Sequence, residues 1–131
     1  MPTKRSPGRF SAVVRRLIDL YRSRERADPS LRLEVADCWM EAEAYRLATD
    51  MTVTRLVGGG RMGAESSLNK IFWSEMDIHL HETALRLLEG DADLDTGWMR
   101  GYQFALAGPI YAGTNEIQRN VIAERLLGLP R

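Results

Sequence analysis

The sequence predicts an all-α protein: an antiparallel (up-and-down) helical bundle of four to five helices. Apolar residues recur at intervals of three and four along most of the chain, which is the spacing of one face of an α-helix. No segment of useful length shows the alternation of polar and apolar residues that a half-buried strand requires. Glycine and proline clusters divide the chain into periodic segments that suit neighbouring antiparallel helices.

The first helix is expected to begin at Ser6-Pro7 and to run to about Glu25. Serine is a favourable N-cap, and proline suits the first helical turn. Ala27-Asp28-Pro29 breaks the helix, because the residue before a proline disfavours the helical conformation. One face of this segment is apolar and predicts packing within a bundle: Phe10, Val13, Val14, Leu17, Ile18 and Tyr21.

Two longer helices are expected to follow, one from near Ser30 to about Leu56 and one from about Ala64 to Glu89. Gly58-Gly59-Gly60 separates them, since three glycines are entropically costly inside a helix. In the first of the two, the apolar packing positions are Leu31, Val35, Trp39, Leu47 and Met51, with Ala36, Ala42, Ala44 and Ala48 allowing close approach. In the second, the residues on or near one stripe are Leu68, Ile71, Phe72, Ile78, Leu85 and Leu88.

The C-terminal part of the chain predicts two shorter helices after a polar loop from Gly90 to Gly97. The first runs from Trp98 to Leu106 and stops at Gly108-Pro109. The last starts after Thr114 and ends at Leu127, where Gly128 and Pro130 are stop signals.

Length and composition predict one domain, residues 1–131. The chain is 44% hydrophobic and 27% charged, with 18 basic and 18 acidic residues, which excludes a disordered tail and a collagen-like repeat. No apolar run approaches the roughly 18 to 20 residues of a membrane span. Cys38 is the single cysteine, so an internal disulfide framework is excluded, and a reducing, cytoplasmic location is expected.

Charge is distributed unevenly along the chain. Residues 1–26 hold eight basic and two acidic residues, a net charge of +6, and the remainder carries −6. A nucleic-acid or membrane arm and a transit peptide are two interpretations of such a segment. The apolar face in the same residues favours a third, a packed amphipathic helix whose partners are acidic. We therefore expect no nucleic-acid partner, and we find no apolar core with a cleavage site that would indicate a secretory signal.

Two clusters resemble metal sites. In the third predicted helix, carboxylate and imidazole side chains lie three or four residues apart, at Glu75, Asp77, His79, His81 and Glu82. A di-iron bundle needs Glu-x-x-His motifs on two helices, whereas both histidines here are on one. We therefore expect an ordinary hydrated helix face and no metal site.

The loop at Asp91-x-Asp93-x-Asp95 resembles the start of a calcium loop but lacks the required Gly and Glu, having Thr96 and Tyr102 instead. It predicts an acidic surface turn. Cys38, between Asp37 and Trp39, lies where negative charge opposes a thiolate, which favours a buried filler over a nucleophile.

The turn that precedes the last predicted helix is the strongest candidate site. Gly113 lets the backbone approach a ligand, and the Thr114 hydroxyl is able to cap the helix. The N–H groups of Thr114, Asn115 and Glu116 would point out of the helix start, where the helix dipole favours an anion. A plain cap and a ligand site both remain open from these residues alone.

The last 22 residues, Ile110-Tyr-Ala-Gly-Thr-Asn-Glu-Ile-Gln-Arg-Asn-Val-Ile-Ala-Glu-Arg-Leu-Leu-Gly-Leu-Pro-Arg131, closely resemble the C-terminal signature of acyl-CoA dehydrogenases. The preceding helices are similar in length and order to that family's C-terminal helical domain. The resemblance covers most of this chain, which corresponds to roughly the last third of a typical member.

The resemblance implies a flavoprotein that oxidises an acyl-CoA thioester between its α and β carbons. In such an enzyme a carboxylate removes the α proton and FAD accepts the β hydride. The base is needed because the α proton of a thioester is only weakly acidic. The family places Thr114 and Glu116 against FAD, often the copy held mainly by a neighbouring subunit, with Tyr111 and Gly113 lining the site.

The chain departs from the family pattern in places that matter for catalysis and FAD binding. Ala112 stands where many members carry the glutamate base, and the first helix, from Phe10 to Tyr21, offers only Asp19 as an acid. The Arg…Phe-Gly sequence that helps to hold FAD is absent around Arg24 to Pro29, and the glycine-rich turn is changed at residues 89–93.

Our leading hypothesis is the C-terminal helical domain of an FAD-dependent acyl-CoA dehydrogenase, present as an excised domain, a truncated product or half of a split protein. We expect it to be inactive alone. The alternative is a non-catalytic interaction subunit of a hetero-oligomeric enzyme. In both, acyl-CoA is the substrate of the complete enzyme, and a homo- or hetero-oligomer forms through the bundle. The apolar residues offered as partner surface are Trp98, Tyr102 and Phe104.

Overall fold

The structure, a computed structural model, describes residues 5–25, 27–94 and 96–131. It is all-helical, with no strand in these ranges, which confirms the predicted fold class. The elements are α1 (Pro7–Ser23), α2 (Pro29–Val57), α3 (Glu65–Leu88), the 3₁₀ turn η1 (Glu89–Asp91), α4 (Gly97–Ala105) and α5 (Asn115–Arg125).

Side-chain caps explain where four of the helices begin. Ser6 accepts a hydrogen bond from the Arg9 N–H at the start of α1, and Asp28 accepts one from the Ser30 N–H at the start of α2. Thr96 and Thr114 cap α4 and α5 in the same way. Each cap satisfies a backbone donor that the helix itself leaves without an acceptor. The observed helix starts therefore lie close to the predicted ones.

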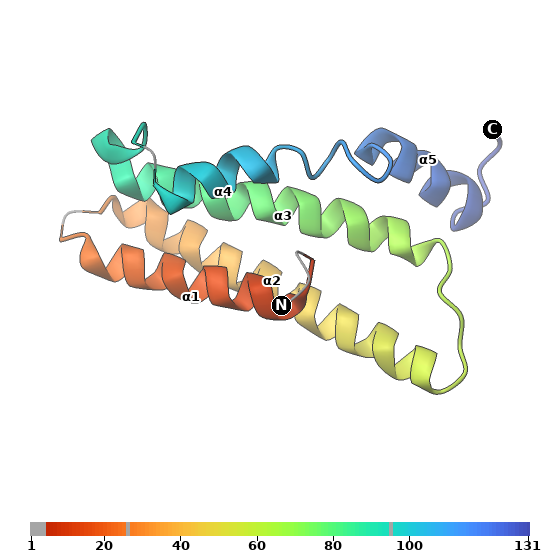
Figure 1. The fold of residues 1–131 in the computed structure, drawn as a ribbon. Coiled ribbons are helices and arrows are strands. Elements are labelled where there is room, and N and C mark those ends of the chain that lie inside the picture. Colours follow the sequence, from red (N-terminus) through yellow and green to blue (C-terminus); the bar gives the residue numbers. More distant parts are fainter. Residues whose placement is uncertain (1–4, 26, 95) are drawn as a thin grey trace.

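Helix α3 is the centre of the arrangement, because it packs against all the other α-helices. Helices α1, α2 and α3 form an antiparallel group, and the short helices α4 and α5 follow one another along α3 (Figure 1). Together α4 and α5 take the place of a fourth long helix. No helix in the described part of the chain is both long enough and apolar enough to cross a membrane.

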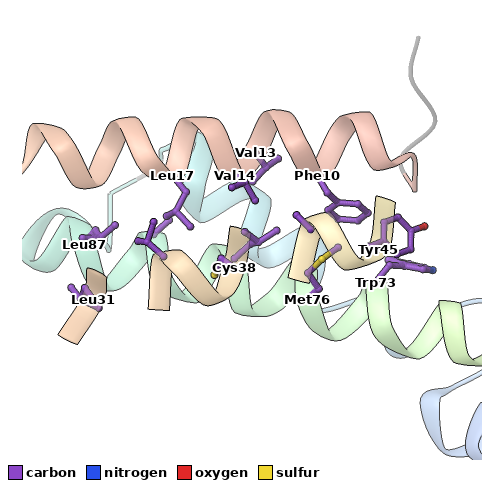
Figure 2. Packing of buried hydrophobic residues seen from close by; sticks show 14 residues of the cluster. Phe10, Val13, Val14, Leu17, Leu31, Cys38, Tyr45, Trp73, Met76 and Leu87 are labelled. Atoms are coloured by element: carbon purple, nitrogen blue, oxygen red, sulfur yellow. The ribbon is translucent and has the colours of Figure 1, made fainter. Parts of the chain in front are cut away.

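The hydrophobic core lies where α1, α2 and α3 meet (Figure 2). Phe10 and Tyr45 pack edge to face with their ring centroids 5.3 Å apart. The Tyr45 hydroxyl donates a 2.8 Å hydrogen bond to the Arg5 carbonyl, so its polar end is satisfied. Cys38 is fully buried in this core, which confirms its expected role as filler.

A second stripe of α3 is buried but polar. It recurs at the spacing of one helix face and consists of Ser67, Lys70, Ser74, Asp77 and His81. Arg9 reaches it from α1 and donates to Asp77 through both terminal nitrogens, at 2.9 and 3.2 Å. Burial alone would raise the pKa of Asp77, but hydrogen bonds from His81 and Arg9 hold it below its usual value.

The predicted hydrated face on α3 is therefore wrong at two positions. Asp77 and His81 are 1% and 4% exposed, and the His81 ring packs edge to face against Trp98. The prediction failed because the residues that bury and pair them, Arg9 and Trp98, are distant in sequence. Glu75 and Glu82 are exposed as expected.

Several predicted packing positions are also wrong. Trp39, Leu47 and Met51 are 51%, 53% and 74% exposed on α2, and Leu68 is 50% exposed on α3. They follow a helical period, but they lie on faces that no other helix of the described chain covers. Conversely, Trp98 is half-buried against the core rather than free to serve as partner surface.

Acidic partners do meet part of the basic first helix. Besides the Arg9–Asp77 pair, Arg24 lies 3.8 Å from Asp91. Lys4, Arg26 and Asp95 lie outside the described residues.

We predict that Arg9→Met destabilises the chain by about 3 kcal/mol, because it leaves the Asp77 carboxylate buried without its cation. Adding Asp77→Leu should recover at least about 1 kcal/mol, since a buried apolar pair tolerates burial better than an unpaired charge. Urea unfolding of the 131-residue chain measures both. Arg16→Met is the control on the same helix, because the exposed Arg16 only covers the Trp98 ring; it should cost less than about 1 kcal/mol. A double variant less stable than Arg9→Met would contradict the prediction.

Candidate functional site

The candidate site is the turn of residues 108–114, between α4 and α5. Its backbone is held by its own hydrogen bonds: the Tyr111 N–H donates to the Ala107 carbonyl at 3.1 Å, and the Asn115 N–H donates to the Pro109 carbonyl at 2.9 Å. At Gly108 a side chain would lie 3.2 Å from the Ser74 Cβ, so glycine permits the close approach of this turn to α3.

Two consecutive residues of the turn adopt left-handed backbone conformations, Ala112 with φ of 56° and Gly113 with φ of 84°. Glycine adopts this region without strain, whereas alanine pays for the crowding of its Cβ. The Gln118 side chain stabilises the turn by donating a 3.0 Å hydrogen bond to the Ala112 carbonyl. The strain at Ala112 is therefore held in place by the start of α5.

Of the three N–H groups that the sequence suggested for an anion, those of Asn115 and Glu116 already have acceptors within the chain. The Asn115 N–H is bound to Pro109, and the Ile117 N–H donates to the Thr114 hydroxyl at 3.3 Å. Hydrogen bonds from its own N–H and from the Thr114 hydroxyl lower the pKa of Glu116. The Thr114 hydroxyl and the negative charge of Glu116 thus both serve as a cap for the start of α5.

Asn115 fixes this turn to the polar stripe of α3, although the sequence had not singled it out for that role. It is 3% exposed, and its Oδ1 accepts a 2.7 Å hydrogen bond from the ammonium group of Lys70. Its Nδ2 lies 3.2 Å from both the Ser74 hydroxyl and a Glu75 carboxylate oxygen. Burial, with a smaller effect from Arg5, lowers the pKa of Lys70.

Tyr111 packs beside Trp73, with ring centroids 6.0 Å apart, and the Arg5 guanidinium lies over both rings at 5.2 and 5.3 Å. These contacts hold the Tyr111 ring against the end of the core.

The side of the turn that faces away from α3 is open. Ala112, Gly113 and Glu116 are exposed, while Tyr111 and Thr114 are half-buried. The predicted site residues Tyr111, Gly113, Thr114 and Glu116 thus lie together, with Ala112 between them, at the turn and the start of α5.

A family model described as "Acyl-CoA dehydrogenase, C-terminal domain" matches residues 4–127. The chain belongs to the acyl-CoA dehydrogenase family. Its five helices are the C-terminal helical domain of that family.

Individual relatives agree with this assignment. The acyl-CoA dehydrogenase IpdE1 of Mycolicibacterium smegmatis is 35% identical over 133 residues, which cover 94% of this chain and 32% of the relative. The chain spans about a third of the length of the curated relatives it matches.

Two solved structures share the fold. The ChsE4-ChsE5 complex from Mycobacterium tuberculosis superposes with a TM-score of 0.78 at 22% identity, covering 96% of this chain and 37% of the other. The FAD complex of PigA superposes with a TM-score of 0.79 at 23% identity, covering 94% and 34%.

Exposed carboxylates lie at the opposite end of this acyl-CoA dehydrogenase domain. There, where the family's FAD-holding sequences are changed, Glu25, Glu89 and Asp91 are exposed. Arg24 lies 3.8 Å from Asp91, which offsets part of the charge of this arginine. A dinucleotide diphosphate needs cations or free N–H donors, so these residues do not fit one.

Other side-chain clusters of this domain have structural explanations. No group of three His, Cys, Asp or Glu side chains in the described ranges is arranged to hold a metal ion. Contacts with the Cys38 thiol and with Glu41, whose carboxylate lies 3.0 Å from the ring, raise the pKa of His79 to about 10. His79 is therefore a charged partner of α2 at neutral pH.

We predict that Asn115→Ala lowers the free energy of unfolding by about 2 kcal/mol, because the buried Lys70 ammonium loses its acceptor. Asn115→Asp should cost less, since a carboxylate can pair with Lys70. Urea unfolding gives the stability, and hydrogen exchange of the α5 amides shows whether the helix start loosens. Asn120→Ala, at an exposed position of α5, is the control. Equal losses for Asn115→Ala and Asn120→Ala would refute this role of Asn115.

Proposed function

We propose that this chain is the C-terminal helical domain of an FAD-dependent enzyme that oxidises acyl-CoA thioesters between the α and β carbons, and that it is inactive alone. The observation that carries the proposal is the segment from Tyr111 to Glu116, which joins the turn to α5 and which we call the Tyr111–Glu116 turn. Its outer side is exposed and Asn115 holds it on α3, in a chain of the acyl-CoA dehydrogenase family. Bound FAD supplies the acceptor for the hydride that leaves the β carbon.

The turn residues suit one part of this task, which is to hold and orient the flavin. The exposed Glu116 carboxylate is a hydrogen-bond acceptor for a hydroxyl group, and its lowered pKa keeps it ionised at neutral pH. The left-handed Gly113 leaves the backbone open to a flat ring system. Thr114 and Tyr111 are the other two residues that we assign to the flavin contact. The carboxylates of Glu25, Glu89 and Asp91 at the opposite end of α3 would repel the FAD diphosphate, which we assign to protein outside these 131 residues.

Position 112 limits the chemistry that this chain supplies. The Ala112 methyl group cannot take a proton, so the base for α-proton removal must come from elsewhere. Asp19 is exposed on α1, whereas the turn is supported by α3. We therefore assign the catalytic base of the assembled enzyme to another segment or another chain.

The first test is activity of the isolated chain. Supplied with FAD, an acyl-CoA and a dye acceptor, it should give no dye reduction above the rate without protein, and Ala112→Glu should not change this. The reason is that a base alone does not create the binding surfaces for flavin and CoA. Dye reduction by the isolated chain would overturn the proposal that it is inactive alone.

The second test is flavin content of the assembly that purifies with this chain. Glu116→Gln should lower the FAD retained per chain several-fold, because the amide is a weaker acceptor than the carboxylate for a hydroxyl donor. Glu124→Gln is the matched control on the same helix, because Glu124 pairs with Arg131 near the end of the chain. Unchanged FAD content in Glu116→Gln would contradict the assignment of this residue.

A non-catalytic subunit of a hetero-oligomeric acyl-CoA dehydrogenase is the second candidate, favoured by Ala112. The ChsE4-ChsE5 complex, a neighbour of the same fold, is an assembly of two proteins. The two candidates differ in where the rest of the enzyme is encoded. A flavin-binding domain in the same reading frame supports the first, and a separate co-purifying dehydrogenase chain supports the second.

A further inference from the structure

The outer face of α1 and α2, which points away from α3, carries a groove that no described helix covers. We name it the Trp39 groove, and its floor consists of Val14, Ile18, Tyr21, Val35, Ala36 and Trp39. It comprises two adjoining hollows that share Ile18 and Trp39. Trp39 is 51% exposed, so a large aromatic side chain lies between two apolar depressions. Half-exposed tryptophans beside such depressions are typical of protein-binding sites.

The rim of the Trp39 groove is positively charged. Arg15 and Arg22 on α1 and Arg32 on α2 line the hollows, and all three are exposed. In the part of the chain that the structure describes, none of the three forms an ion pair. A fourth arginine, Arg46, is neutralised by Glu43 and Asp50. A complementary surface therefore has to be acidic.

The groove has the dimensions of a helix-binding site. It runs between two antiparallel helices, from Ser11 to Arg22 along α1. At 1.5 Å per residue this is about 17 Å, or three helical turns. Methyl-lined hollows spaced along such a groove accept the apolar side chains of an amphipathic helix.

A second copy of this chain fits the groove poorly. A two-fold contact would place the arginine rim of one copy against the same rim of the other, which like-charge repulsion opposes. Single-stranded nucleic acid would use flat aromatic platforms, whereas Ile18, Val35 and Ala36 give the hollows beside Trp39 aliphatic walls.

We propose that the Trp39 groove binds an amphipathic helix of a different protein chain, with its apolar face on Trp39 and its carboxylates opposite Arg15, Arg22 and Arg32. The inference rests on the proposed function in one respect: the partner is taken to be another subunit of the assembled acyl-CoA dehydrogenase. It adds the location and the chemistry of the contact.

The experiment places a photo-reactive benzoylphenylalanine at position 39 of the chain, expressed in its native cells. After irradiation, the cross-linked peptide is sequenced. We expect one peptide from another chain, with apolar residues at helical spacing flanked by Asp or Glu. The double variant Arg15→Glu, Arg32→Glu should reduce its yield at least tenfold. The same cross-linker at the exposed Leu33, which does not line the groove, should not capture this peptide.

Cross-links to a further segment of the same polypeptide, to a second copy of the chain, to a peptide without flanking acids, or to nothing would each overturn the proposal. The purified chain supplies a further arm, in which its tryptophan fluorescence is titrated with a thymidine oligonucleotide and with phosphatidylglycerol vesicles, and Trp39→Phe gives the contribution of Trp73 and Trp98. If the oligonucleotide or the vesicles quench this fluorescence, and Arg15→Glu abolishes the quenching, the groove is assigned to nucleic acid or to membrane instead. FAD content is measured in the same cells, so a failed flavin assignment and a failed docking assignment are distinguishable.

Discussion

The buried polar stripe of α3 sets the positions of the elements around it. Arg9 is drawn to Asp77 from α1, and the Lys70 ammonium is drawn to Asn115 at the start of α5. Polar groups this deeply buried tolerate few alternative arrangements, because any shift leaves a charge without a partner. The apolar core on the adjacent face of α3 supplies most of the burial. The polar stripe decides which register of α1 and α5 is compatible with it.

The candidate site depends on this constraint directly. The Tyr111–Glu116 turn has little hydrophobic burial of its own, and it includes an alanine in a left-handed conformation. Its position is fixed by the hydrogen bonds of Asn115 with Lys70 and Ser74 on α3. The packing of Tyr111 against Trp73 holds it on a second side. A rigid support beneath an exposed turn is what an orienting site needs, because fixed donors and acceptors do not have to be ordered when the ligand arrives.

The helices and the turn could be predicted from the sequence because their signals are local: caps at Ser6 and Thr114, a glycine run at residues 58–60, and a C-terminal signature. Burial could not be predicted in the same way. Asp77 looks like a surface carboxylate until Arg9, 68 residues away, is placed beside it. Trp39 and Met51 look like core residues because periodicity identifies a face but not whether anything covers it. Asn115 carried no signal beyond its place in the motif.

The basic residues of the N-terminal segment fall into two groups, those with partners inside the domain and those exposed on its surface. Some arginines of the basic N-terminal segment have partners within the domain. Arg9 pairs with Asp77, Arg24 lies near Asp91, and Arg16 lies over the face of Trp98. Arg15 and Arg22, on the opposite side of α1, have no such partner among the described residues and border an exposed tryptophan. Exposed arginines at the edge of an uncovered apolar surface are the charges that an acidic partner would contact. The acidic excess that balances them inside this chain lies mainly on other elements, so the charge that complements this face has to come from another surface.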